Sequence, residues 1–137
     1  MATGVDPSML APAERVARFI ETLDPTAIED AFADSDVTII ENFAPYRFAG
    51  SHAVEDWTAG MTAHRAGTSN LSHVLGAAQD FSRTGNRVFF SLPTTWTGLN
   101  RNRPFTETGG WAFVLLEQRD GWRVQSYGWA VTTFLFD

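Results

Sequence analysis

Two long β-rich runs, residues 105–118 (FTETGGWAFVLLEQ) and residues 122–134 (WRVQSYGWAVTTF), flank the turn Arg119-Asp120-Gly121. Aspartate followed by glycine between such runs is a strong hairpin signal, because glycine adopts the positive φ that the turn needs. The sequence therefore predicts an antiparallel hairpin over residues 103–134.

Side chains alternate between the two faces of a strand, so each run predicts which residues share a face. One face of the first run carries Glu107, Gly109, Trp111, Phe113 and Leu115, and one face of the second carries Arg123, Gln125, Tyr127, Trp129 and Val131. Large aromatic side chains mixed with a few polar groups are typical of a cavity wall. We therefore expect the hairpin to line a pocket.

The composition narrows the class of protein. The 137 residues are enough for a single domain (residues 1–137), and 44% of them are hydrophobic, as in ordinary globular proteins. A formal net charge of −6 without any basic run argues against nucleic acid or an anionic membrane as partner. There is no cysteine, no apolar run of membrane-spanning length and no signal peptide pattern, so we expect a bacterial-type cytoplasmic protein.

The chain before the hairpin alternates helix signals with strand signals. The expected elements are a flexible tail at residues 1–7, helices over residues 13–23, 26–32 and 52–65, and strands over residues 37–43, 71–82 and 87–99. Tight turns make neighbouring strands antiparallel. The predicted fold is α+β, with a cone-shaped, strongly curved antiparallel sheet wrapped around the N-terminal helices.

Three stretches, residues 31–37 (AFADSDV), 41–50 (ENFAPYRFAG) and 121–127 (GWRVQSY), carry a resemblance to a known superfamily. Together with the order of the elements, they resemble the nuclear transport factor 2-like superfamily in its polyketide-cyclase-like (SnoaL-like) branch, over residues 12–134. The resemblance implies the cystatin-like α+β barrel and a homodimer formed through the sheet. It implies no single activity, because this fold hosts isomerases, dehydratases, cyclases, hydrolases and non-catalytic binders.

Ketosteroid isomerase, a relative in that superfamily, uses an aspartate base and an oxyanion hole of a tyrosine and a protonated aspartate. The resemblance places Asn42 at the base, Phe19 at the tyrosine and Leu115 at the protonated aspartate. None of these side chains performs the corresponding role, which argues against classical ketosteroid isomerase activity.

The resemblance to scytalone dehydratase, another relative, extends to more of the catalytic residues than the resemblance to ketosteroid isomerase does. Residues 72–76 (SHVLG) resemble the stretch that bears one of its catalytic histidines, and Asp24 falls near its helix-end aspartate. Leu23 and Asn42 stand at its tyrosine positions, however, and no second histidine lies on the strand over residues 87–99.

His73 is the first candidate for an acid or base, because imidazole titrates near neutral pH. If His73 faces the cone, it lies among Trp96, Trp111 and Trp129; otherwise it is a partly exposed strand histidine. Asp24 could orient His73, or it could serve only as a helix N-cap.

Glu107 is the third catalytic candidate. It shares the parity of Trp111, and a carboxyl against aromatic walls would have a raised pKa, although a solvated position at the mouth is equally compatible. Glu41 and Asn42 alternate along a strand, so only one of them faces inward. We expect Asn42 inside, as a donor to a ligand carbonyl, and Tyr46 nearby as a source of a phenolic proton.

The predicted ligand-binding residues are those expected on the interior of the cone. They are Phe19, Asn42, Tyr46, Trp57, Met61, Trp96, Trp111, Phe113, Tyr127 and Trp129. No two-ligand metal motif, phosphate loop or nucleophile elbow is present, so we expect neither a metal nor an organic cofactor.

The leading functional hypothesis is a cofactor-independent proton-transfer enzyme of the dehydratase, isomerase or cyclase type. Its substrate would be a small apolar or aromatic carbonyl compound bound in the cone. The alternatives are a non-catalytic small-molecule-binding module and a dimeric interaction domain. The sequence does not separate a weak enzyme from a binder, because both need the same apolar walls.

Overall fold

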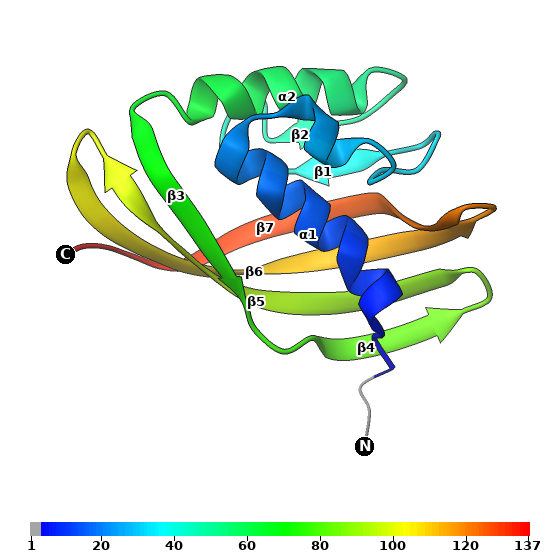
Figure 1. Cartoon of the computed structure of the whole chain (residues 1–137). Helices are drawn as coiled ribbons and strands as arrows, with labels where there is room; N and C mark the ends of the chain where they lie inside the picture. Colours follow the sequence, from blue (N-terminus) through cyan, green and yellow to red (C-terminus); the bar gives the residue numbers. More distant parts are fainter. Residues whose placement is uncertain (1–3) are drawn as a thin grey trace.

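The computed structural model describes residues 4–137 as a strongly curved sheet with helices on its concave side (Figure 1). The helices are α1 (Pro7–Thr22), the 3-10 turn η1 (Pro25–Ile28) and α2 (Ala53–His64). The strands are β1 (Thr38–Ile40), β2 (Arg47–Phe48), β3 (Thr68–Leu75), β4 (Gln79–Thr84), β5 (Arg87–Asn100), β6 (Arg103–Gln118) and β7 (Gly121–Phe136). The strand order is β2-β1-β7-β6-β5-β3, with β4 also paired to β5. All pairings are antiparallel except β1 with β7, so the predicted α+β fold is confirmed.

The hairpin consists of the two longest strands of the sheet, β6 and β7, and its turn leads into Gly121 at φ 122°. The face predicted for β6 is confirmed, since Trp111, Phe113 and Leu115 are buried. On β7 the predicted face is correct only in part. The register shifts beside Gln125, so Trp122 and Val124 point into the core instead of Arg123 and Gln125. A β-bulge adds one residue to one strand and thereby exchanges its faces.

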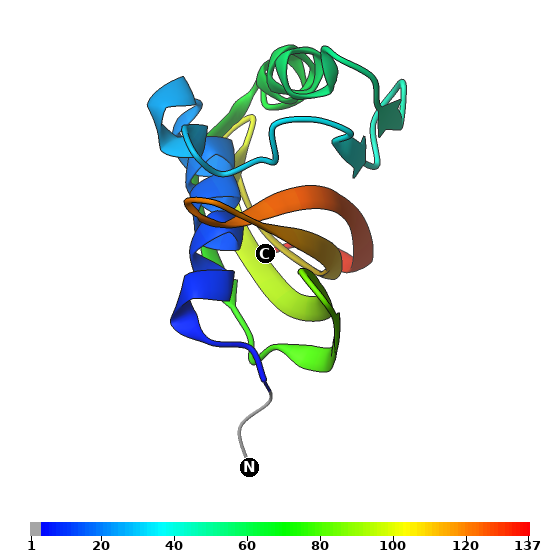
Figure 2. The same cartoon turned by 90° about the vertical axis from the view of Figure 1, so that its right-hand side faces the viewer.

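Helix α1 crosses the concave face of the sheet (Figures 1 and 2). Asp6 caps it by accepting hydrogen bonds from the backbone N–H groups of Ser8 and Met9, so the helix begins at Pro7, earlier than predicted. Its apolar stripe is confirmed: Val16, Phe19 and Ile20 are buried. The tail predicted over residues 1–7 is therefore one residue too long at its end, where Pro7 belongs to the helix. Residues 1–3 lie outside the described part of the chain.

Arg65, directly after α2, fixes the end of α1. Its Nη1 donates to the carbonyl oxygens of Ile20 and Glu21 at 2.9 and 2.8 Å, and its Nη2 donates to the carbonyl of Thr68. The carbonyls of Ile20 and Glu21 lie in the last turn of α1, where a helix offers them no partner of its own. One guanidinium thus ties α1, α2 and β3 together where they border the cavity described below.

Three predicted elements differ from the structure. The helix over residues 26–32 is only the turn η1, because Glu29 leaves helical geometry at ψ 133° and Asp30 follows with a positive φ of 62°. The strand over residues 71–82 is divided into β3 and β4, which pair with different parts of β5. The loop after β1 contains the short strand β2, which the sequence analysis did not predict. No helix within residues 4–137 is long and apolar enough to cross a membrane.

Candidate functional site

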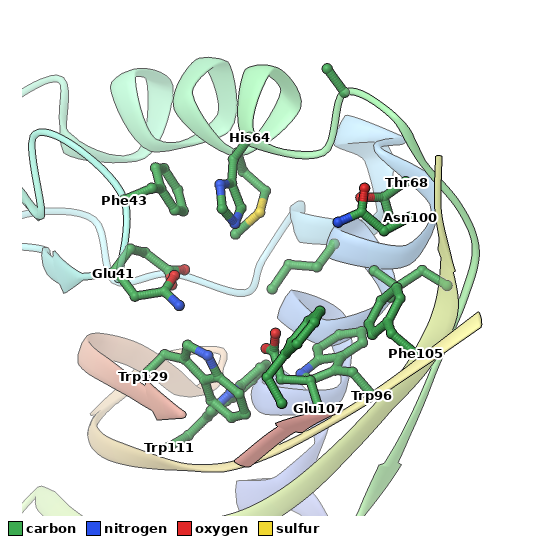
Figure 3. A pocket seen from close by; sticks show the side chains of 16 residues that line it. Glu41, Phe43, His64, Thr68, Trp96, Asn100, Phe105, Glu107, Trp111 and Trp129 are labelled. Carbon is green, nitrogen blue, oxygen red and sulfur yellow. The ribbon is translucent and has the colours of Figure 1, made fainter. Parts of the chain in front are cut away.

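A cavity of about 240 Å³ opens between the sheet, α2 and the end of α1 (Figure 3). Six of its 16 lining residues are aromatic: Phe43, Trp96, Phe105, Trp111, Trp129 and Phe134. The others are Ile20, Glu41, Asn42, Met61, His64, Ala66, Thr68, Leu71, Asn100 and Glu107. The volume lies below the roughly 300–1,000 Å³ of pockets for drug-sized ligands, so it suits a compound of one or two rings.

Glu41 is the most buried acidic residue of this wall, with 5% of its surface exposed. Its Oε2 accepts a hydrogen bond from the indole Nε1 of Trp57 at 3.0 Å and a second, short one from the Tyr127 hydroxyl. Removal from water raises the pKa of Glu41 to about 7; the two hydrogen bonds oppose this rise, and the charge of Glu107 adds to it. The group is therefore poised between its acid and base forms at neutral pH.

Tyr127 remains a hydrogen-bond donor to Glu41 over the same range of pH. Complete burial, followed by the neighbouring Glu41 charge, raises the pKa of its hydroxyl well above the usual value. Its ring stacks on Trp111, with ring centroids 5.5 Å apart and planes at 15°. Packing and hydrogen bonding therefore hold the Glu41 carboxyl in one orientation.

Glu107, on β6, supplies the second carboxyl of the cavity (Figure 3). Partial burial raises its pKa, and a hydrogen bond with Trp129 offsets part of the rise. A Cβ at Gly109 would lie 2.7 Å from Cη2 of Trp129, so glycine lets that indole lie against β6. Glu107 thus lies among aromatic rings, as its parity with Trp111 indicated, and its catalytic role stays a prediction.

The rim of the cavity carries weaker polar groups. His64, in the last turn of α2, stacks on Phe43 with centroids 4.3 Å apart, and partial burial lowers its pKa. Thr68 and Asn100 are directly paired across β3 and β5 on the opposite side (Figure 3). These groups can contact the polar end of a ligand without entering the apolar floor.

The predicted ligand-binding residues divide into three groups. Asn42, Met61, Trp96, Trp111 and Trp129 line the cavity. Phe19, Trp57, Phe113 and Tyr127 are buried in the core behind it, where Trp57 and Tyr127 act through Glu41. Tyr46 is 60% exposed and does not line the cavity, so its predicted position is wrong.

The expectation that only one of Glu41 and Asn42 faces inward is wrong, because both line the cavity. Asn42 lines it as expected but is exposed, whereas Glu41 is buried. Burial alternates along residues 37–42, so Glu41 shares the core face of Val37 and Ile39. The backbone N–H of Glu41 donates to the carbonyl of Tyr46 and continues the pairing of β1 with β2 past Ile40.

His73 shares a face of the sheet with Trp96, its cross-strand partner, but it does not line the cavity. Its Nδ1 lies 2.6 Å from Oε2 of Glu21, and the same oxygen accepts its backbone N–H at 2.9 Å. His73 thus lies in a separate groove between α1 and β3, with Trp96 between it and the cavity. The prediction that His73 lies in the pocket is therefore wrong, since its imidazole is paired with Glu21 of α1 outside the cavity.

Asp24 does not support His73. It caps η1, where its Oδ1 accepts from the backbone N–H and the hydroxyl of Thr26, and these bonds lower its pKa. It is exposed and outside the cavity. Of the three catalytic candidates from the sequence, only Glu107 borders the cavity.

Several cavity residues were not anticipated from the sequence: Phe43, His64, Asn100, Phe105 and Phe134. Phe134 enters because a second register shift, beside Thr132, places it opposite Glu107. A bulge of this kind leaves no clear sequence signal. The parity of Phe105 with Glu107 was available, since they lie two residues apart on β6.

At the level of sequence, no protein-family model and no curated protein matches the chain. Solved structures do match it in shape. A nuclear transport factor 2-like superfamily protein from Salmonella enterica aligns with a TM-score of 0.71 and 19% identity, over 89% of this chain and 87% of the other.

Two further structural neighbours are named as enzymes. The hexachlorocyclohexane dehydrochlorinase LinA-type3 from Novosphingobium barchaimii has a TM-score of 0.77 and 8% identity, covering 95% of this chain and 88% of the other. A candidate ketosteroid isomerase from Shewanella frigidimarina has a TM-score of 0.70 and 16% identity, covering 93% and 98%. Residues 4–137 therefore adopt the nuclear transport factor 2-like fold.

Proposed function

We propose that the protein catalyses proton transfer on a small apolar or aromatic carbonyl compound, without an organic cofactor. Glu41 is the general base, in place of the His73 expected from the sequence. The observation that supports this assignment is a buried carboxyl with a pKa of about 7 at the wall of an aromatic cavity. A general base works best when its pKa lies near the operating pH.

In the proposed reaction, Glu41 removes a proton from the carbon next to the carbonyl group, and the electron pair moves onto the carbonyl oxygen. The buried indole N–H of Trp111, which lines the cavity and has no hydrogen-bond partner within residues 4–137, donates a hydrogen bond to that oxygen. The proton then returns from Glu41 to another carbon, which is an isomerisation, or a leaving group departs, which is an elimination. Both outcomes need only the Glu41 carboxyl and the surrounding rings.

The structural neighbours support this proposal through the fold, since one is named as a dehydrochlorinase and one as a candidate ketosteroid isomerase. The mechanism differs from that of classical ketosteroid isomerase. Glu41 provides a carboxyl next to the position assigned to its base, but Phe19 and Leu115 are buried apolar residues and supply no oxyanion hole.

The direct test is exchange of the carbon-bound protons of indanone and tetralone in deuterium oxide, followed by NMR. The protein should accelerate this exchange, and Glu41→Gln should slow it by about 10²- to 10⁴-fold, the usual loss on removing a positioned base. Circular dichroism would check that the variant is folded. An unchanged rate in a folded Glu41→Gln variant, or no acceleration of either ketone by the wild type, would refute the proposal.

A binding module with no catalysis is the second candidate. One observation favours it: Oε2 of Glu41 is already engaged by Trp57 and Tyr127, as expected for a purely structural carboxyl. This alternative predicts that ketones bind without any accelerated exchange. The homodimer through the outer face of the sheet remains a prediction for either function, and sedimentation of a monomer would contradict it.

A further inference from the structure

The hydrogen-bonding groups around the cavity are unevenly divided between donors and acceptors. The Trp57 N–H and the Tyr127 hydroxyl donate to Glu41, and Trp129 hydrogen-bonds with Glu107. Within residues 4–137, Oε1 of Glu41 has no hydrogen-bond partner. The buried indole N–H of Trp111 has no hydrogen-bond partner within residues 4–137. The deep part of the cavity therefore offers a ligand this donor together with carboxyl oxygens and aromatic faces, while amide and imidazole groups stay at its rim.

The two carboxyl groups also lack a cation. The 16 lining residues include no lysine or arginine, and within residues 4–137 neither Glu41 nor Glu107 forms an ion pair. Acidic residues elsewhere on α1, β6 and the β6–β7 turn do form them: Glu21 with His73, Glu117 with Arg83, and Asp120 with Arg123. Buried carboxylates are normally paired, because an isolated buried charge is costly.

The aromatic side chains supply a second kind of site for positive charge. Trp96, Trp111 and Trp129 stand close together, with Trp111 centred 6.3 Å from Trp96 and 5.7 Å from Trp129. The face of an indole attracts cations, and tryptophan is the best of the aromatic residues in this respect. Indole faces beside carboxyl groups without an ion-pair partner favour a cation over an anion at this wall of the cavity.

We propose that the ligand of this cavity carries a protonated amine next to its apolar ring, with the amine held between the Trp96, Trp111 and Trp129 rings and Glu107. This inference names the substrate class of the site proposed above and rests on that site being the one where the ligand binds. Anionic compounds are excluded, because they would face two carboxyl groups without a counter-charge.

The test compares four probes of one shape: aminoindane, indane, indanone and indane carboxylate. Binding is measured by tryptophan fluorescence and calorimetry. At a pH one unit above the pKa of Glu41, aminoindane should bind at least about tenfold more tightly than indane, the effect of a desolvated cation over aromatic rings. Indane carboxylate should bind more weakly than indane. Equal affinity for aminoindane and indane, or tightest binding by indanone or the carboxylate, would overturn the proposal.

The groups that face the bound amine set the pH dependence of this preference. Glu41 and Glu107 become charged as the pH rises, whereas the Tyr127 hydroxyl and the His64 imidazole stay neutral around neutral pH, in line with their shifted pKa values. The preference for aminoindane should therefore weaken when the pH falls below the pKa of Glu41. A preference that strengthens on acidification would contradict the proposal.

Glu107→Gln should remove most of the preference for aminoindane and leave indane binding unchanged. Glu21→Gln is the matched control, because it removes the same charge outside the cavity and should change neither affinity. If Glu107→Gln does not fold, Glu107→Asp provides the comparison, because it keeps the charge but withdraws the carboxyl from the rings, and it should reduce the preference for aminoindane. An amine preference that survives in the folded variant would refute the assignment. Because binding is measured without turnover, this result is independent of the exchange test of the proposed reaction.

Discussion

The cavity and the groove on the other side of Trp96 each contain a glutamate that accepts two hydrogen bonds through a single oxygen. In the cavity, Oε2 of Glu41 takes them from Trp57 and Tyr127. In the groove, Oε2 of Glu21 takes them from the backbone and the imidazole of His73. Glu41 is 5% exposed, whereas the Glu21 side chain is 22% exposed and its partner His73 is 18% exposed.

Burial, more than residue type, decides which of these side chains suits the proposed proton transfer. The groove contains the imidazole that sequence reasoning favours, but its carboxyl is paired and in contact with solvent. The cavity contains a carboxyl that forms no ion pair within residues 4–137, and burial raises its pKa to about 7. Perturbed pKa values in a concave site are a better indicator of chemistry than an isolated histidine.

The largest expected effect is on catalytic rate, which should depend on the cavity and not on the groove. Replacing Glu41 by glutamine should slow ketone exchange by about 10²- to 10⁴-fold. Replacing His73 by glutamine should leave the rate within a few-fold, because the imidazole does not reach the cavity. Initial exchange rates of both variants under one set of conditions provide the measurement. A large loss in His73→Gln with none in Glu41→Gln would reverse the comparison.

The next effect is on stability as a function of pH. The folded-state pKa of Glu41 is about 7, above its unfolded value near 4.5. Folding therefore favours the protonated form, and this contribution is complete below pH 4.5 and is lost as the pH rises to 7. At about 1.4 kcal/mol per pKa unit, the loss is roughly 3 kcal/mol.

Glu41→Gln should lack this loss, because its amide does not ionise. The measurement is urea denaturation of both proteins across this pH range, taken as the difference in unfolding free energy so that other titrating groups cancel. The difference in unfolding free energy between the two proteins should be constant below pH 4.5. Between pH 4.5 and 7 it should shift by roughly 3 kcal/mol in favour of the variant. Parallel curves would show that Glu41 titrates equally in the folded and unfolded states.

A smaller effect is expected from Tyr127→Phe, which removes one hydrogen bond from Glu41 but keeps the ring against Trp111. Leaving a buried acceptor short of a partner should cost about 1–3 kcal/mol of unfolding free energy. Since this hydrogen bond lowers the pKa of Glu41, the variant should also show its exchange activity at higher pH. Tyr46→Phe, the same change at an exposed tyrosine, is the control and should alter neither property.

The smallest effect is expected in the groove. Glu21→Gln weakens a partly exposed pair with His73. It should lower the unfolding free energy by at most about 1 kcal/mol, as for other solvent-accessible ion pairs. Thermal unfolding of this variant beside Glu41→Gln would complete the comparison. A cost of several kcal/mol would mean that the groove pair is as important to folding as the cavity network.

Much of the fold was predictable because it depends on local patterns. The hairpin followed from Asp120-Gly121 between long β-rich runs, and the buried face of α1 followed from Val16, Phe19 and Ile20 at helical spacing. The division of residues 71–82 into β3 and β4 was not predictable in the same way. Both strands pair with β5, and such pairing depends on contacts far apart in the sequence.

The site was predicted only in part. The inward position of Glu41 was available from its parity with Val37 and Ile39, whereas the bulge that brought Phe134 into the cavity leaves no clear signal in the sequence. The position of Glu21 over His73 depends on how α1 crosses the sheet, which no local pattern records. The aromatic walls were foreseen at Trp96, Trp111 and Trp129, since strict alternation holds there.

The most direct test of this account is the pKa of Glu41 itself, measured by NMR of its side-chain carboxyl carbon with Glu41→Gln to assign the signal. The account predicts a midpoint near 7, displaced downward when aminoindane is bound. A midpoint near 4.5, the ordinary value for glutamate, would mean that the carboxyl is well hydrated. Glu41 would then have no advantage over Glu21, and the central claim would be contradicted.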